Sequence, residues 1–252
     1  MPACFEHDAA ARIATEAGQV LLALRERAAR QEIAPQVLRD KADHRSHDML
    51  MRALTASFPN DPILSEEAND DGARLDSRRV WIIDPLDGTR EYGEPGRTDW
   101  AVHVALVIDE QPLAGAVALP ARGMTLSTAE PPMLPDRRTG PARIVVSRTR
   151  PPAVALDLEE RLGADLLEMG SAGAKAMAVV LGEADIYVHS GGQHEWDSAA
   201  PVAVAAAAGL HVSRIDGTPL RYNQPDSWLP DLLICRSELR DQVLDALGSA
   251  LT

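Results

Sequence analysis

An apolar run near position 80 ends in two aspartates that frame a short turn. Residues 81–92 read WIIDPLDGTREY, so Asp84 and Asp87 lie three positions apart at the end of the run. Both carboxylates can face one cavity there, and Leu86 between them can offer its backbone carbonyl. Carboxylate and carbonyl oxygens are the ligands that Mg²⁺ and Mn²⁺ prefer in proteins. The pattern indicates a hard-cation site, although an ordinary strand edge and turn would also produce it.

The two residues after the second aspartate, Gly88 and Thr89, suit an anion. Glycine permits close backbone approach, and the residues after it can open a helix whose N–H groups point at a phosphate. The Thr89 hydroxyl can also orient a water molecule. One turn could therefore serve a metal ion and a phosphate together.

Further acidic residues lie where predicted strands, loops and helices meet, and these are Asp43, Glu66, Glu67 and Asp197. No cluster of histidine or cysteine accompanies them, which favours Mg²⁺ or Mn²⁺ over zinc. An EF-hand is excluded, because the loop positions that need oxygen ligands, glycine and glutamate hold Leu86, Gly88, Thr89 and Pro95. Taken alone, Asp197 is more typical of the N-cap of the alanine-rich helix after it, and Glu67 is more typical of an acid in solvent or behind the ligands than of a ligand.

The composition limits the classes of partner. The 252 residues are 45% hydrophobic and 25% charged, which is ordinary for a globular protein that needs no disulfide or structural metal to fold. The formal net charge of −13 argues against nucleic acid, since such binding needs Lys and Arg to neutralise phosphates. The same charge would repel a phosphorylated substrate, so bound divalent cations would have to invert the local field.

The N-terminal sequence and the cysteines bear on the compartment. MPACFEHDAAARIATEAG carries acidic residues early and lacks the apolar core of a signal peptide. No window approaches the roughly 20 apolar residues of a membrane span. The two cysteines, Cys4 and Cys235, form no CxxC pair. These features predict a cytoplasmic protein with no membrane partner.

Apolar periodicity predicts the elements that must position the acids. We expect helices over 8–30, 46–57 with Ser46 as N-cap, 152–162, 172–183, 197–209 and about 237–248. We expect strands over 61–67, 79–83, 100–109, 113–120, 124–129, 143–147 and 184–190. The Pro-rich and charged stretch 129–143 predicts a loop between two lobes.

Three separated motifs in the same order resemble the inositol monophosphatase superfamily of Mg²⁺-dependent, lithium-sensitive phosphatases. The motifs are LSEE, DPLDGT and EWDSAAPVAVAAAAG, and Asp43 precedes Glu66 by 23 residues, similar to the family's spacing. DGTREY and GSAGAKA are most similar to the CysQ branch, the 3′(2′),5′-bisphosphate nucleotidases, and particularly its actinobacterial members. The resemblance implies an α/β (α+β) fold with α-β-α-β-α layers. It implies a single unit over 1–252, with an N-terminal lobe of about 1–140, a C-terminal lobe of about 141–252 and an active site between them.

The resemblance also implies metal roles for the acidic residues. Glu66 would bind the first metal, Asp84 would bridge two metals, and Leu86 would give its carbonyl. Asp87 and Asp197 would hold the second metal and border the substrate. Two or three Mg²⁺ ions are implied, with Mn²⁺ as a substitute.

For the substrate and the attacking water, the resemblance implies further roles. Backbone amides of Gly88 and Thr89 would receive the phosphate, and Thr89 paired with Asp43 would activate the water. Ser171 and Lys175 would contact the substrate, and Arg90 could meet a second phosphate or pair with an acid. Lys175 could equally be a helix residue that reaches out to solvent.

For other residues that could have been functional, a structural role is the favoured explanation. His44, His47 and His103 lack metal-ligand spacing and are expected at the surface or the edge of the core. Trp81, Trp100 and Trp196 are expected to pack in the interior. Trp228 and Tyr222 are somewhat better candidates for contacting a nucleoside, although packing is still the favoured role for both.

The function implied is hydrolysis of a phosphate monoester, with 3′-phosphoadenosine 5′-phosphate of sulfate assimilation as the expected substrate. Inositol 1-phosphate and fructose 1,6-bisphosphate are alternatives with the same chemistry. A metal- and phosphate-binding sensor without catalysis is an alternative of another class. The resemblance further implies a homodimer.

Overall fold

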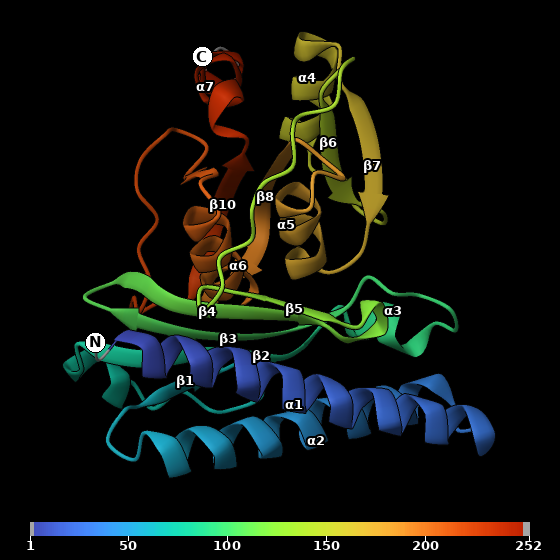
Figure 1. The fold of residues 1–252 in the computed structure, drawn as a ribbon, viewed down its shortest axis with the longest axis vertical. Coiled ribbons are helices and arrows are strands. Elements are labelled where there is room, and N and C mark those ends of the chain that lie inside the picture. The colour runs from blue at the N-terminus through green and yellow to red at the C-terminus, as the bar shows by residue number, and fades with distance from the viewer. Residues whose placement is uncertain (1–2, 249–252) are drawn as a thin grey trace.

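The chain folds into two five-stranded sheets, with helices between them and on their outer faces (Figure 1). The structure is a computed structural model that describes residues 3–248. Its α-helices are α1 (Ala3–Arg30), α2 (Pro35–Ser57), α3 (Thr89–Gly93), α4 (Ala153–Leu162), α5 (Ala172–Val180), α6 (Glu195–Ala207) and α7 (Arg240–Gly248). Short 3-10 turns are η1 (Ala73–Asp76), η2 (Pro120–Arg122) and η3 (Ser237–Leu239).

The strands of the first sheet are β1 (Ile63–Ser65), β2 (Arg79–Asp87), β3 (Ala101–Ile108), β4 (Gln111–Leu119) and β5 (Met124–Ser127). They lie in chain order, with β1 parallel to β2 and the other neighbours antiparallel. The strands of the second sheet are β6 (Arg143–Ser147), β7 (Asp165–Met169), β8 (Ile186–His194), β9 (His211–Ser213) and β10 (Trp228–Cys235). Their order is β7-β6-β8-β10-β9, and β10 runs antiparallel to both its neighbours.

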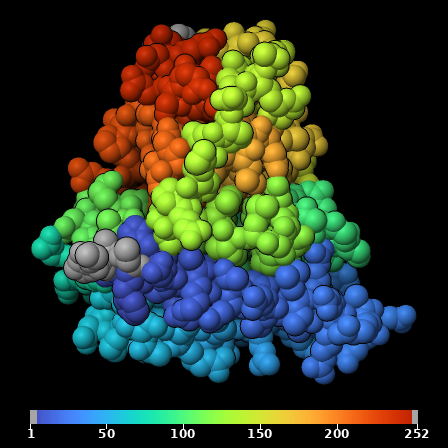
Figure 2. Space-filling view, viewed as in Figure 1, coloured from blue at the N-terminus to red at the C-terminus, as the bar shows by residue number. Residues whose placement is uncertain are grey.

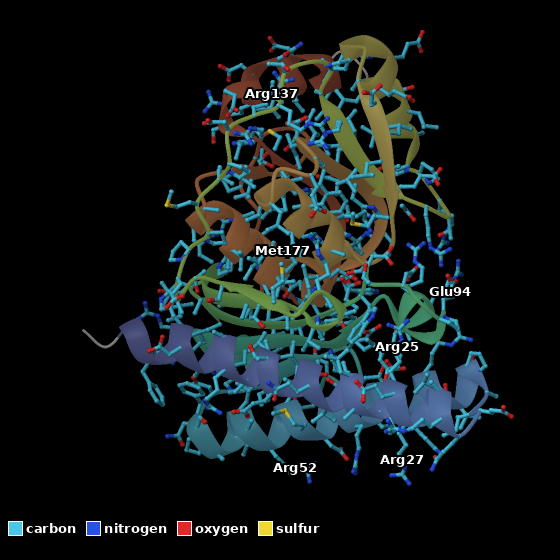
Figure 3. All side chains as sticks on the ribbon, turned by 45° about the vertical axis from the view of Figure 1, so that its right-hand side comes forward. Arg25, Arg27, Arg52, Glu94, Arg137 and Met177 are labelled. Atoms are coloured by element: carbon cyan, nitrogen blue, oxygen red, sulfur yellow. The ribbon has the colours of Figure 1, made fainter. Side chains whose placement is uncertain are left out.

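The elements form five layers, which confirms the α-β-α-β-α fold. Helices α1 and α2 cover one face of the first sheet, and α5 and α6 lie between the two sheets, where Figure 3 labels Met177 of α5. Helices α4 and α7 cover the far side of the second sheet. A sheet that is covered on both faces needs apolar residues at successive positions, which explains the unbroken apolar run of β2. Trp81 and Ile83 of that run face α1 and α2, whereas Val80 and Ile82 face α6.

One hydrophobic core joins the halves of the chain. It contains residues of the first sheet, such as Leu64 and Val117, and residues of the second half, such as Val145 and Tyr187. The segment 128–142, which has no helix or strand, runs across the surface of the second half, as the yellow-green band in Figure 2 shows. The single unit over 1–252 and the lobe boundary near 140 both stay predictions.

Several predicted boundaries were wrong, and the largest error concerns α2. This helix begins at Pro35 rather than at residue 46, because its buried residues recur only every four positions and leave little apolar periodicity to read. Ser46 is therefore no N-cap. It lies in the middle of α2, fully buried, and its hydroxyl donates to the Pro85 carbonyl at 2.6 Å. That bond holds α2 against the turn after β2.

Candidate metal and phosphate site

Three aspartates from distant parts of the chain converge between the two sheets. One carboxylate oxygen from each of Asp84, Asp87 and Asp197 lies within 4.8 Å of the others. Asp84 and Asp87 come from the end of β2, where the pairing with β3 shifts register between them. That irregularity lets residues three apart present side chains to one place. Asp197 comes from the first turn of α6. The structure brings these three together, whereas Glu66, which was predicted to share their metal site, lies outside this set, and metal binding stays a prediction.

Asp84 is the most deeply buried acid of the three. One of its oxygens accepts a hydrogen bond from the Leu86 amide at 3.0 Å. Burial, and then the charges of Glu66, Asp87 and Asp197, raise the pKa of Asp84 well above its usual value. The carboxyl groups of Asp84 and Glu66 also interact directly, and this interaction favours the protonated form of Asp84 and the ionised form of Glu66 by raising the pKa of the first and lowering that of the second.

Glu66 stands at the rim of this cluster. The residue is exposed at the surface, but its carboxylate lies near the buried acids and is partly shielded from solvent. Desolvation, followed by the charge of Asp197, raises the pKa of Glu66 to about 7. Glu67 beside it is also exposed and adds negative charge. A carboxylate that is costly to ionise alone becomes a good ligand once a cation compensates it.

Asp87 is held differently, because protein donors surround its carboxylate. Its oxygens accept from the Ser171 hydroxyl at 2.5 Å and from the amides of Ala172 and Gly173 at 3.0 and 2.6 Å. Burial alone would raise the pKa of Asp87, but hydrogen bonding and positive charge lower it to about 2. Asp87 is therefore ionised even without a cation.

His103 contacts the proposed metal ligand Asp87, which the sequence interpretation missed. It is fully buried on β3, which contradicts the expected place at the surface or core edge. Its Nδ1 lies 3.0 Å from the Trp196 carbonyl, and its Nε2 lies 3.2 Å from Asp87, although the angle there is poor for a hydrogen bond. The Trp196 carbonyl can accept a hydrogen bond only if Nδ1 of His103 carries a proton, and the Asp87 carboxylate favours a proton on Nε2. Burial opposes a charged ring, but the contact with Asp87 outweighs it and raises the pKa of His103.

Lys175 and Ser171 lie behind Asp87 and are not free to reach solvent. The Lys175 ammonium donates to the carbonyls of Gly170 and Ser171, and it lies 5.5 Å from the centre of the Tyr187 ring. Ser171 caps α5 by accepting from the Ala174 amide. Burial lowers the pKa of Lys175, against the attraction of Asp87 and Asp197. These contacts support positioning of Asp87 rather than direct contact with substrate.

Asp197 is not the N-cap that its position suggested, because α6 begins at Glu195 with His194 as its N-cap, and Asp197 is the third residue of the helix. Its carboxylate accepts from the His194 amide at 2.7 Å, as a helix-capping residue does, while it also faces Asp84 and Asp87. Burial, and then the charge of Asp87, raise the pKa of Asp197 to about 6. The capping bond fixes the carboxylate where the other two acids can share a cation with it.

The turn after Asp87 has the conformation that a close-approach glycine allows. Gly88 has a φ of 83°, and a Cβ there would lie 3.0 Å from Ser171. Thr89 begins the short helix α3, and its hydroxyl donates to the Leu86 carbonyl at 3.0 Å. Figure 3 shows Arg25 of α1 beneath this helix, where its guanidinium donates to the Glu94 carbonyl. Arg25 of α1 therefore holds the segment that follows α3 in place.

Asp43 lies on α2, half-buried, and its predicted partner is occupied elsewhere. Burial, and then the charges of Glu67 and Asp40, raise the pKa of Asp43 to about 7. No hydrogen bond joins Asp43 to Thr89 in the part of the chain that the structure describes. Their pairing stays a prediction. Arg90 is exposed, and within residues 3–248 it makes no ion pair or hydrogen bond.

The aromatic residues considered above differ in how deeply they are buried. Trp81 and Trp100 are fully buried, as predicted, and Trp196 is half-buried. Tyr222 is also fully buried, with its hydroxyl 3.1 Å from that of Ser198, so it is not a surface for a nucleoside. Trp228 is 45% exposed.

The donor set fits a hard divalent cation. It offers only oxygen ligands, and four carboxylates gather where the buried Lys175 ammonium and the His103 ring lie nearby. Carboxylates in such a place ionise together only if a further positive charge joins them. Glu66, Asp84, Asp87 and Asp197 are the side chains that could hold it, with the Leu86 carbonyl next to them.

Comparison with known proteins agrees with this site. The profile of the Inositol monophosphatase family matches residues 6–132 and 138–248, so the chain belongs to that family, whose members are metal-dependent. A 3′-phosphoadenosine 5′-phosphate phosphatase of Mycobacterium bovis is 51% identical over 243 residues, which cover 93% of this chain and 90% of that protein. The 3′(2′),5′-bisphosphate nucleotidase CysQ of Escherichia coli is 32% identical, over 75% of this chain and 80% of that protein.

Solved structures also share the fold. CysQ from Bacteroides thetaiotaomicron, a bacterial member of the inositol monophosphatase family, superposes with a TM-score of 0.76 at 28% identity. The match covers 91% of this chain and 96% of that one. Within the described residues, no helix is long and apolar enough to cross a membrane.

The raised pKa of Asp197 predicts how stability depends on pH without metal. Between the unfolded value near 3.8 and the folded value of about 6, the native state holds a proton that the unfolded chain has lost. The free energy of unfolding therefore falls as pH rises through this window, by about 3 kcal/mol for a shift of about two units. Asp197→Asn, which keeps the capping acceptor, should lose less stability between pH 4 and 7.5. Urea unfolding in a chelator measures this, and parallel pH profiles for both proteins would contradict it.

His103 should matter to stability through its contact with Asp87. Removing one partner of a buried charged pair typically costs about 3–5 kcal/mol, so His103→Ala should lower the unfolding midpoint clearly. In the Asp87→Asn background, His103→Ala should lower the free energy of unfolding by at least about 1 kcal/mol less than in the wild type. The carboxylate charge that His103 compensates is absent there. His44→Ala on the exposed face of α2 is the matched control and should change stability by about 0.5 kcal/mol or less. Purely additive costs in a double-mutant cycle would refute the coupling.

Proposed function

We propose that the chain is a Mg²⁺-dependent phosphate monoester hydrolase that removes the 3′-phosphate of 3′-phosphoadenosine 5′-phosphate. The observation that carries the proposal is the triad of Asp84, Asp87 and Asp197 beside the Gly88 turn. Relatives named for this substrate align over more than nine-tenths of the chain, which supports the choice of substrate.

The metal ligands of the proposal are Glu66, Asp84, Asp87, Asp197 and the Leu86 carbonyl. Bound divalent cations would supply the positive charge that stabilises the attacking and leaving oxygens of the transferred phosphoryl group. We propose two or three Mg²⁺ ions, which Mn²⁺ could replace. The pKa of Asp87 is lowered, which favours its ionised form before any cation binds, whereas bound cations would favour the ionised forms of Asp84, Glu66 and Asp197, whose pKa values are raised.

The other side chains bind and orient the reactants. Amides of Gly88 and Thr89 would hold the phosphate, as the left-handed Gly88 leaves the backbone open to it. Thr89 and Glu66 would position the attacking water, and Asp43 would accept a hydrogen bond from Thr89 once that hydroxyl leaves the Leu86 carbonyl. The exposed guanidinium of Arg90 would attract the second phosphate of a bisphosphate.

Two alternatives keep the same site. Inositol 1-phosphate and fructose 1,6-bisphosphate carry phosphate monoesters that the triad could hydrolyse equally well. A sensor without catalysis would use the pocket for binding only. A homodimer and a cytoplasmic location stay predictions.

The deciding experiment compares kcat/KM for the three substrates in one Mg²⁺ buffer. We expect the highest value for 3′-phosphoadenosine 5′-phosphate, and loss of activity after chelation. Asp84→Asn should reduce turnover by about a thousandfold or more, because it removes the ligand charge nearest the other acids. Asp48→Asn, at an exposed position of α2, is the control and should keep wild-type rates.

Release of no phosphate from any of the three substrates would refute the proposed enzyme and favour the sensor. A clear preference for inositol 1-phosphate or fructose 1,6-bisphosphate would overturn the choice of substrate and leave the hydrolase intact.

A further inference from the structure

Three aromatic rings lie together where β8 meets α6. The rings of His194 and Trp196 are stacked, with centroids 4.5 Å apart and planes 9° apart. The ring of Trp228 meets His194 edge-on, with centroids 5.7 Å apart and planes at 89°. We call these three residues the aromatic ledge. Nothing in the proposed chemistry uses them so far.

The ledge begins one hydrogen bond away from the acidic triad. The amide of His194 donates to the Asp197 carboxylate at 2.7 Å, so the backbone that carries the ledge also fixes a metal ligand. Trp196 precedes Asp197 directly, and its carbonyl is the acceptor for His103. The His194 and Trp196 end of the ledge therefore lies next to Asp197, at the edge of the proposed phosphate site.

The backbone and side chains around the ledge hold it in place. Trp228 is paired with His194 across β10 and β8, and the Glu195 amide donates to the Ser227 carbonyl at 2.8 Å. The Ser227 hydroxyl lies 3.2 Å from Nδ1 of His194 and fixes its ring. The Asp226 side chain accepts from the Trp228 amide at 3.0 Å. A ring that is fixed before binding loses little entropy on contact with a ligand.

The ledge is open on one side. Trp228 is 45% exposed, whereas Trp81 and Trp100 are completely buried. Within the described residues, its indole N–H has no hydrogen-bond partner. Space is also free along the part of β8 that precedes the ledge, because a Cβ added to Gly191 or Gly192 would meet no atom within 4 Å. An exposed indole beside open space is a surface on which a flat ring can stack.

We propose that Trp228, backed by His194 and Trp196, stacks against the nucleobase of the bound nucleotide and so selects nucleotides over sugar phosphates. This inference rests on the proposed function and deepens it, since it assigns the base-binding surface. Stacking on an aromatic face tolerates any base, so the ledge would favour a nucleotide without choosing adenine. The choice among bases would then fall to polar groups elsewhere.

The test measures binding of two matched ligands by calorimetry to the Mg²⁺-loaded protein. Adenosine 5′-phosphate and ribose 5-phosphate share the sugar and phosphate and differ by the base. Trp228→Leu keeps an apolar side chain but removes the aromatic face. It should raise the Kd of adenosine 5′-phosphate by about tenfold or more and that of ribose 5-phosphate by less than about twofold. Trp228→Phe should restore most of the difference. Phe5→Ala, an exposed aromatic of α1, is the control and should alter neither ligand.

Equal weakening of both ligands in Trp228→Leu, or no weakening of either, would overturn the inference. Failure of Trp228→Phe to restore the difference would do so as well. Because the readout is binding, its outcome is independent of turnover. An enzyme that releases phosphate from 3′-phosphoadenosine 5′-phosphate yet binds both ligands equally after Trp228→Leu would keep the proposed function and lose only the ledge.

Discussion

Crowding of carboxylates in a buried place is the constraint on which the rest of the site depends. Three aspartate oxygens within 4.8 Å, with Glu66 at the rim, repel one another strongly where water cannot screen them. The protein answers in two ways. It surrounds Asp87 with donors from the start of α5 and with His103, and it leaves the other acids with raised pKa values. The remaining negative charge is what a divalent cation would satisfy.

The layered fold supplies this arrangement by bringing three element ends to one place. The end of β2 carries Asp84 and Asp87, the start of α5 binds Asp87, and the start of α6 carries Asp197. Both helices lie between the sheets, so their N-terminal amides and dipoles face the acids rather than solvent. A protein with a net charge of −13 can thereby create a local attraction for phosphate once cations are bound.

Much of this could be read from the sequence, and the exceptions have physical causes. Asp84 and Asp87 were predictable because they end an apolar run, whereas the metal role of Asp197 came only from the resemblance, since alone this residue could have been a helix cap. His103 was not, because one histidine in a strand gives no spacing signal, and only the folded sheet shows that it lies against Asp87. Strand β10 was missed since Pro230 and Asp231 interrupt its apolar pattern, at the point where its register shifts. The bonds of Ser171 and Lys175 to inner groups likewise depend on packing alone.

The central claim is that these carboxylates form one cation site, and a crystal structure with Mn²⁺ and phosphate tests it most directly. Anomalous scattering locates Mn²⁺ without reference to the protein. The account predicts a peak within about 2.0–2.3 Å of oxygens from Asp84, Asp87 and Asp197, with phosphate against the Gly88 turn. Peaks that contact none of these oxygens, or phosphate bound at a distant surface, would contradict it.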